Sequence, residues 1–223
     1  KRALAIGNEI ENEYVVAAAL EGLGLIARRH RNWREARSLF EQFLALERKL
    51  KNTSQIANAL FRLGSIAFAQ SDIAIARARY EESLSLYREL GFKQLIAILL
   101  NNLGEVARYQ GDYVEASTLY SDSLNLLQEQ DIGFEHDQAM VLLNMGYVAY
   151  RQGHYARARE LFGESFLLCQ RLEEEENSAL CLVGMAGILV SMQRPEKAVS
   201  LISAARTVFD TVGVGLNHPG QAG

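Results

Sequence analysis

Cysteine and proline are scarce in this chain. Its 223 residues include two cysteines, Cys169 and Cys181, with no CxxC pair, and two prolines, Pro195 and Pro219. This pattern does not indicate a structural disulfide framework, and it favours a reducing cytoplasm. Because both fall on apolar stripes, we expect small core residues at these positions. Few prolines and almost no β-branched alternation predict an all-helical protein.

Several functional signatures are also missing. The net charge of −4 excludes a dominant basic surface and so argues against direct binding of nucleic acid. No apolar run approaches the roughly 18 uninterrupted residues that a membrane span needs. The four histidines lack metal-ligand spacing, and no GxxxxGK[ST], GxSxG or post-strand GxGxxG motif occurs. We therefore expect no enzyme activity, no cofactor and no metal.

What the chain does contain is an internal repeat. A glycine is followed twelve residues later by an alanine in four units, and a fifth unit has alanine at both positions. The spacings between the second alanines are 40, 40, 42 and 40 residues. The pairs are Gly24 and Ala36, Gly64 and Ala76, Gly104 and Ala116, Gly146 and Ala158, and Ala186 and Ala198.

Each unit shows the pattern of two antiparallel helices. Leucines such as Leu20 and Leu60, four residues before the glycine, belong to an i, i+3, i+4, i+7 apolar stripe. The second helix has a large apolar residue four positions after its alanine: Phe40, Tyr80, Tyr120, Phe162 and Ile202. Turns are predicted at Arg31-Asn32, Ser71-Asp72, Gly111-Asp112, Gly153-His154 and Gln193-Arg194.

The small residues have a predicted role in this hairpin. Glycine on the first helix and alanine on the second should let the two backbones approach closely where the helices cross. One hairpin cannot cover its own apolar surface, so successive hairpins must stack. We therefore predict an all-α, right-handed α-solenoid of antiparallel helix hairpins.

The expected repeat boundaries follow from this periodicity. Residues 1–11 would be the second half of a truncated second helix, and residues 214–223 a tail. The five repeats are expected at 12–52, 53–92, 93–133, 134–174 and 175–213, the last being degenerate.

These landmarks resemble the tetratricopeptide repeat. NLGEVARYQGDYVEASTLY at 102–120 and NMGYVAYRQGHYARARELF at 144–162 match its pattern of Leu-Gly, an aromatic residue, then alanine and an aromatic residue. Ile73 and Pro195 replace the aromatic residue that opens the second helix in other repeats. The resemblance covers residues 1–213 and implies a superhelical protein-binding or peptide-binding scaffold.

A narrower resemblance concerns the 40–42-residue repeat length and the segment ALCLVGMAGILVSMQRPEKAVSLISAARTVFDTVGV. Both are similar to the repeats of bacterial signalling ATPases, the multidomain transcription regulators of the LuxR-like and maltose-activator type. Kinesin light chains and bacterial peptide-sensing regulators carry similar repeats, so the host protein stays open. Since the chain starts at Lys1 in the middle of a predicted hairpin, we expect a piece excised from a longer protein. A capping helix in a processed protein is the alternative.

A ligand groove is expected on the first helix of each repeat, at positions that the core stripe does not use. These positions mix amide, guanidinium and aromatic groups, which suit an extended peptide because Asn pairs with backbone amides and Arg with carboxylates. The resemblance implies that Asn102 and Asn144, with Arg62 in register, contact the ligand backbone. The first repeat adds Glu21, Leu25, Arg28 and Arg29. The candidate groove residues are Asn58, Phe61, Arg62, Ser65, Asn101, Asn102, Glu105, Arg108, Tyr109, Asn144, Tyr147, Tyr150 and Arg151.

Each candidate has a plainer interpretation. Arg28, Arg108 and Arg151 lie in the last turn of a helix, where the helix dipole favours a cation. Tyr147 and Tyr150 could pack against the neighbouring repeat. We predict a non-catalytic module that binds a protein or peptide in its concave groove, with other domains of its parent chain as further candidate partners. The alternatives are a small-molecule effector domain of a transcription regulator and a structural self-association element.

Overall fold

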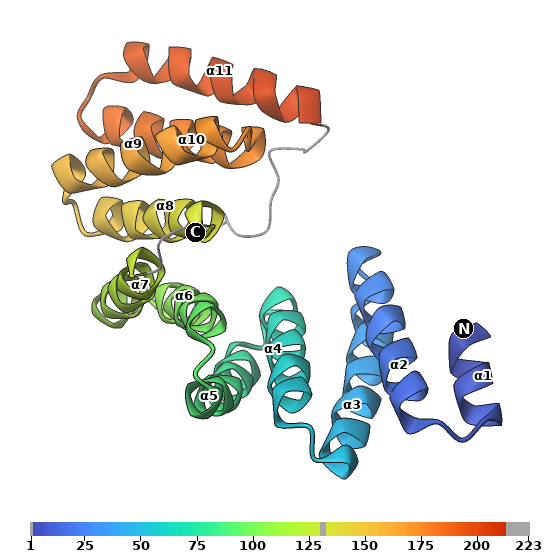
Figure 1. The fold of residues 1–223 in the computed structure, drawn as a ribbon. Coiled ribbons are helices and arrows are strands. Elements are labelled where there is room, and N and C mark those ends of the chain that lie inside the picture. Colours follow the sequence, from blue (N-terminus) through green and yellow to red (C-terminus); the bar gives the residue numbers. More distant parts are fainter. Residues whose placement is uncertain (1, 130–132, 213–223) are drawn as a thin grey trace. The chain divides into compact units, whose positions relative to one another are not determined.

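Helices make up the regular structure of the part of the chain described by a computed structural model, residues 2–129 and 133–212, and no strand occurs there. The helices are α1 (Arg2–Glu9), α2 (Glu13–Arg29), α3 (Trp33–Leu50), α4 (Thr53–Ala69), α5 (Ile73–Leu90), α6 (Lys93–Tyr109), α7 (Tyr113–Gln128), α8 (Glu135–Arg151), α9 (Tyr155–Arg171), α10 (Glu175–Ser191) and α11 (Pro195–Val212) (Figure 1). The predicted all-α fold of helix hairpins is confirmed. None of the helices in these ranges is long and apolar enough to cross a membrane.

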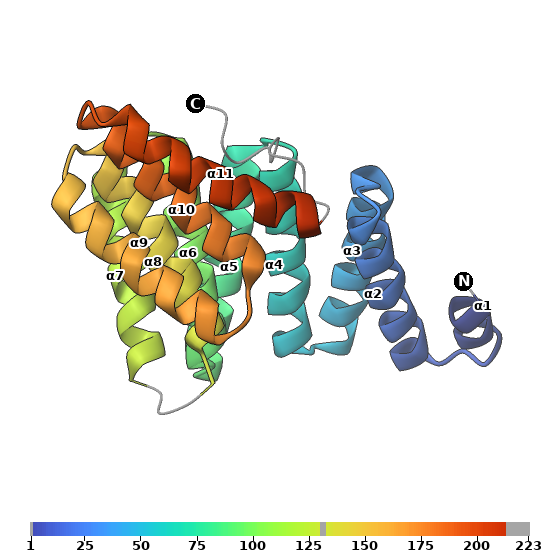
Figure 2. The same cartoon turned by 90° about the horizontal axis from the view of Figure 1, so that it is seen from above.

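The chain forms two compact units, residues 1–106 and residues 107–223, with the boundary inside α6. In unit 1, α1 to α4 each pack against the next helix along the chain. In unit 2, α7 to α10 do the same, and α10 also contacts α8 (Figure 2). Packing of each helix on its sequence neighbours is the architecture expected of stacked hairpins.

The turns between helices share one backbone feature, a residue with positive φ. Such a residue terminates a helix by turning the chain back in the left-handed conformation. The next residue often caps the following helix: the Asp112 side chain accepts a hydrogen bond from the Glu115 backbone N–H at 2.9 Å. All five predicted turns are confirmed, with positive φ at Arg31, Ser71, Gly111, Gly153 and Gln193.

The predicted core columns are buried. The alanines at 36, 76, 116, 158 and 198 are at most 1% exposed. The large residue four positions later is at most 3% exposed in the first four repeats, as at Phe40 and Phe162. Ile202 in α11 is the exception at 46%, because α11 packs on α10 and no later helix follows it in the described chain.

The role predicted for the repeat glycines needs correction. A Cβ atom at Gly64 would lie 2.7 Å from the ring of Tyr80, and one at Gly146 would lie 2.7 Å from the ring of Phe162. The nearest atoms therefore belong to the aromatic side chain of the second helix and not to its backbone. Glycine is needed because the ring occupies the volume of the missing side chain.

Candidate functional site

Unit 1 places four predicted groove residues on one face of α4. Asn58 Nδ2 donates to Glu21 Oε1 on α2 at 2.8 Å, and Arg62 Nε donates to Asn58 Oδ1 at 3.3 Å. The Arg62 guanidinium also lies over the ring of Phe61, 5.3 Å from its centroid. A chain of polar contacts therefore joins the first helices of two neighbouring repeats.

Ser65, on the next turn of α4, is part of the packing within the repeat. Its hydroxyl donates to the Phe61 carbonyl oxygen at 3.0 Å and accepts from the Tyr80 hydroxyl at 3.3 Å. Tyr80 is 3% exposed, and burial raises the pKa of its hydroxyl above the ordinary range. Ser65 therefore positions Tyr80, and its hydroxyl already takes part in two hydrogen bonds within the repeat.

The charge at Arg62 is only partly compensated. Burial is the main cause that lowers the pKa of its guanidinium, and the positive charge of Arg28 lowers it further. Glu21 and Tyr87 act in the opposite direction. Among the described residues, Arg62 forms no ion pair. Its half-buried positive charge is therefore subject to the repulsion of Arg28 without a carboxylate paired to it.

Three further candidates in unit 1 lie on α6. Asn101, Asn102 and Glu105 are all half-buried. The negative charge of Glu105 contributes to raising the pKa of Tyr80, so Glu105 lies within electrostatic range of the α4–α5 hairpin. This part of α6 adds amide and carboxylate groups to unit 1.

One buried carboxylate near this face was not singled out from the sequence. Glu47 on α3 is 4% exposed, and its Oε2 atom is buried without a hydrogen-bond partner. Burial is the main cause that raises its pKa, the charge of Glu21 adds to this, and a hydrogen bond from the Asn52 side chain opposes it. A sequence signal could have found Glu47. The equivalent positions of the later repeats, at intervals of 40 or 42 residues, hold the uncharged residues Tyr87, Leu127, Cys169 and Phe209.

We expect Glu47→Gln to raise the free energy of unfolding at pH 7.5 by about 1 kcal/mol, because it removes an unpaired buried charge. Because the pKa of Glu47 is raised in the native state, its carboxyl group stays protonated there at pH values between 4.5, its ordinary pKa, and the higher native pKa. Stability from this group is therefore present below pH 4.5 and is lost as pH rises through the native pKa.

Urea unfolding followed by circular dichroism at pH 4 and pH 7.5 tests this expectation. The difference between variant and parent should be present at the higher pH and vanish at the lower. Glu41→Gln is the matched control, since Glu41 is exposed on the same helix and should show no difference at either pH. An equal effect of Glu47→Gln at both values would contradict a cost of ionisation.

In unit 2, two predicted groove tyrosines connect neighbouring repeats. The Tyr147 hydroxyl donates to the Leu180 carbonyl oxygen on α10 at 3.2 Å, and its ring meets Phe162 edge-on with centroids 5.1 Å apart. Burial raises the pKa of Tyr147 to about 12. The Tyr150 hydroxyl lies 3.1 Å from Ser191 Oγ. The packing alternative considered for both tyrosines thus describes their contacts.

The other candidates in unit 2 differ widely in exposure. Asn144 is 6% exposed and lies in the interior, whereas Tyr109 is 58% exposed. Arg108 is half-buried, and exposed Arg151 donates from Nε to the Tyr113 hydroxyl at 3.2 Å. The predicted groove residues of unit 2 thus range from buried to exposed, whereas those on α4 in unit 1 are all half-buried.

Among residues 2–129 and 133–212, no three His, Cys, Asp or Glu side chains are grouped to hold a metal ion. Two surface depressions of unit 1 lie away from the predicted groove residues. One is lined by residues of α3 that include Arg34 and Gln42, and the other by residues that include Gly7 and Leu46.

Family profiles match most of the chain. Two profiles, both described as tetratricopeptide repeat, match residues 55–129 and 137–210, and residues 21–74. The chain belongs to the tetratricopeptide repeat family. The family resemblance inferred from the repeated Gly, Ala and aromatic positions is thereby confirmed. No curated protein sequence matches the chain significantly.

Solved structures with the same fold come from several tetratricopeptide-like proteins. BtubC (BKLC) from P. vanneervenii shares 18% identity and a TM-score of 0.71, over 98% of this chain and 86% of that one. The quorum sensor NprR from B. thuringiensis shares 16% identity and a TM-score of 0.75, over 93% and 58%. The Rap conjugation gene regulator of plasmid pLS20, solved with the Phr* peptide, shares 13% identity and a TM-score of 0.76, over 89% and 55%. At these identities the similarity shows the fold, and this chain spans little more than half of the last two proteins.

Proposed function

We propose that this tetratricopeptide repeat chain is a non-catalytic module that binds a peptide or an extended protein segment. In unit 1, the contact face would consist of Glu21, Arg28, Asn58 and Arg62. The observation that carries the proposal is the state of Arg62, a half-buried guanidinium with a single hydrogen bond and no ion pair among the described residues. Arginine has five N–H donors, so four remain for a ligand.

The surroundings of Arg62 favour an anionic or carbonyl-rich ligand. Arg28 adds a second positive charge, while Asn58, itself held by Glu21, accepts a hydrogen bond from the guanidinium at Nε. A pre-oriented guanidinium loses less side-chain entropy when it binds a carboxylate or a peptide carbonyl. Half-buried Asn101 and Asn102 on α6 supply amide groups of the kind that pair with a peptide backbone.

Structural neighbours support a peptide as the ligand. NprR has been solved with its cognate peptide NprX, and Rap regulators with the Phr* peptide and with Competence and Sporulation Factor. These proteins demonstrate that the fold can hold a peptide. We further propose that the chain is the sensor or scaffold region of a larger bacterial regulator in the cytoplasm. The resemblance of its closing segment to LuxR-like and maltose-activator regulators motivates that part.

The binding proposal is tested by Arg62→Ala. Peptides would first be selected from a random decapeptide library on the immobilised parent chain, and their affinities measured by fluorescence anisotropy. We expect Arg62→Ala to weaken the selected peptides at least tenfold, equivalent to about 1.4 kcal/mol. Loss of charge-assisted hydrogen bonds has this magnitude or more.

Arg88→Ala is the matched control. Arg88 lies on α5 in the same unit, is exposed, and carries the same charge. We expect its removal to leave the affinities unchanged at fixed salt concentration. Equal losses in the two variants would mean that general electrostatics, and not the Arg62 face, governs binding. Failure of the library to yield any binder would contradict the proposed function itself.

A further inference from the structure

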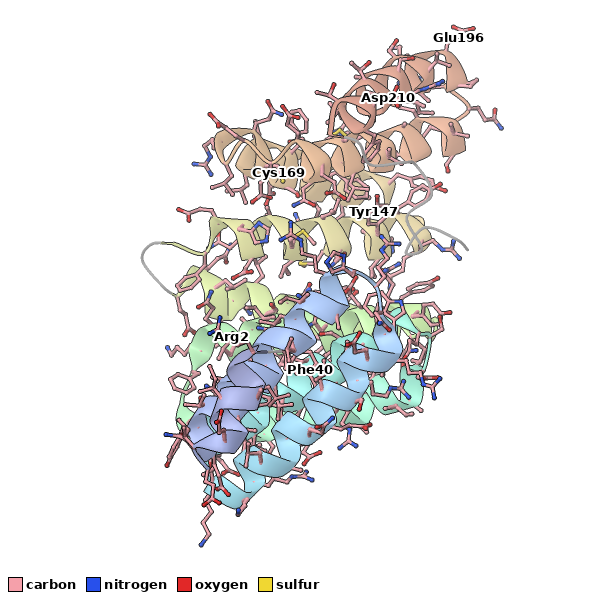
Figure 3. All side chains as sticks on the ribbon, turned by 90° about the vertical axis from the view of Figure 1, so that its right-hand side faces the viewer. Arg2, Phe40, Tyr147, Cys169, Glu196 and Asp210 are labelled. Atoms are coloured by element: carbon pink, nitrogen blue, oxygen red, sulfur yellow. The ribbon has the colours of Figure 1, made fainter. Side chains whose placement is uncertain are left out.

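The two cysteines of the chain lie on adjacent helices of unit 2. Cys169 is on α9 and Cys181 on α10, and these helices pack against each other. Both thiols are free and 0% exposed. Figure 3 shows Cys169 on its helix, with sulfur atoms in yellow. The predicted role of both residues as small core side chains is confirmed, but core packing alone does not require that two thiols meet.

A serine hydroxyl brings the two thiols together. Ser165 lies one helical turn before Cys169 on α9, so their side chains occupy the same face of the helix. The Cys181 thiol donates to Ser165 Oγ at 3.3 Å across the α9–α10 interface, and Ser165 Oγ itself donates to the Ala139 carbonyl oxygen at 2.8 Å. Cys181 is thus held against the turn of α9 that carries Cys169.

The two thiols also differ in acidity. The neighbouring Cys181 thiol is the main cause that lowers the pKa of Cys169; burial opposes it, and the nearby Ser165 hydroxyl adds to the lowering. The same contact with Cys169 raises the pKa of Cys181 above the ordinary range, and burial adds to the rise. A thiolate is the reactive form of cysteine, so Cys169 is the more nucleophilic member.

We propose that Cys169 and Cys181 form a reversible disulfide that joins α9 to α10 when the protein meets hydrogen peroxide. The Cys169 thiolate attacks one peroxide oxygen, the O–O bond breaks, and hydroxide leaves, giving a sulfenic acid on Cys169. The Cys181 sulfur then attacks the Cys169 sulfur, the S–O bond breaks, and the second oxygen leaves as water. Overall, two thiols and one peroxide give one disulfide and two waters.

Hydrogen peroxide suits this buried pair because it is little larger than a water molecule. A bulky disulfide oxidant would need a wider opening of the α9–α10 interface than peroxide does. The product bond would close a short loop around the turn that contains Glu173, and it would link the fourth repeat to the fifth. Cross-links of this kind restrict the unfolded chain and stabilise the linked elements.

The test is to expose the folded chain to hydrogen peroxide and to digest it with trypsin without reduction. Trypsin cleaves after Arg171, so the cysteines fall in separate peptides, residues 160–171 and 172–197. We expect these two peptides to appear joined and two hydrogens lighter than their sum. The free-thiol count should fall from two to zero and return with dithiothreitol.

Two controls make the outcome decisive. Cys181→Ala should stop the reaction at a Cys169 sulfenic acid that dimedone traps, and a non-reducing gel should show that the cross-linked parent remains a monomer. The parent should also unfold at a higher urea concentration when oxidised. The proposal is wrong if the folded chain keeps both thiols while the urea-unfolded chain loses them, or if the cross-linked peptides come from dimers.

Discussion

Replacing Phe162 with alanine is expected to lower the free energy of unfolding of unit 2 by about 3–5 kcal/mol, the usual cost of emptying a buried aromatic site. The ring is 0% exposed, and it lies between α8 and α10 at Gly146 and Gly184. Its edge-on contact with Tyr147 would also be lost. Because α8 packs on α9 and α10 packs on α11, neither α8 nor α10 can move far enough to fill the cavity left by the ring.

Urea unfolding monitored by circular dichroism and by hydrogen exchange in unit 2 measures this loss. Leu167→Ala is the matched control because Leu167 lies on the same helix but is 65% exposed. The control should change stability by no more than about 0.5 kcal/mol. Comparable losses in both variants would show that Phe162 is not the central packing residue of this unit.

A second large effect is expected at Gly146. A Cβ at this position would lie 2.7 Å from two ring atoms of Phe162. The ring also has little room to move away, because it packs closely on Gly184 of α10 as well, where a Cβ would lie 2.5 Å from it. Gly146→Ala should therefore destabilise unit 2 by about 1–3 kcal/mol through overpacking. This loss comes despite alanine's advantage over glycine in a helix, about 1 kcal/mol.

Gly163 supplies the control with the opposite sign. It is a helical glycine on α9, and a Cβ there would meet no atom within 4 Å. Gly163→Ala should therefore stabilise the chain by about 0.5–1 kcal/mol through helix propensity alone. The pair would be measured by the same urea titration. Stabilisation by both substitutions would contradict the ring-to-glycine contact, and Phe162→Leu should relieve the cost of Gly146→Ala.

Helix propensity alone predicts the gain at Gly163 but misses the loss at Gly146. Glycine-to-alanine exchange within a helix is usually favourable, and the two glycines compared here are 17 residues apart in sequence. What separates them is the presence of Phe162 over one and open space over the other. The repeat therefore depends on a glycine–aromatic contact that couples the two helices of a hairpin.

The helices, turns and core columns of this chain were predictable from its sequence. Each depends on residues within one hairpin, and the same physical requirement recurs at a 40-residue interval. The alanine column, the five turns and the buried aromatic positions at Phe40, Tyr80, Tyr120 and Phe162 were all confirmed for this reason. For this core, the structure was needed only to show why glycine recurs. An aromatic ring of the second helix, and not its backbone, fills the space that a side chain would take.

The accessibility of the candidate groove residues was not predictable in the same way. Arg62 and Asn144 occupy the same repeat position, yet Arg62 is half-buried in a polar network and Asn144 is 6% exposed. Tyr147 contacts α10 through a hydrogen bond that a periodic pattern cannot specify. The sequence by itself determined which residues form helices and a core, because those choices follow from local periodicity. Only the tertiary structure decided which polar side chains remain accessible, and that Cys181 packs against the turn of α9 that carries Cys169. Both depend on the side chains of the neighbouring repeat.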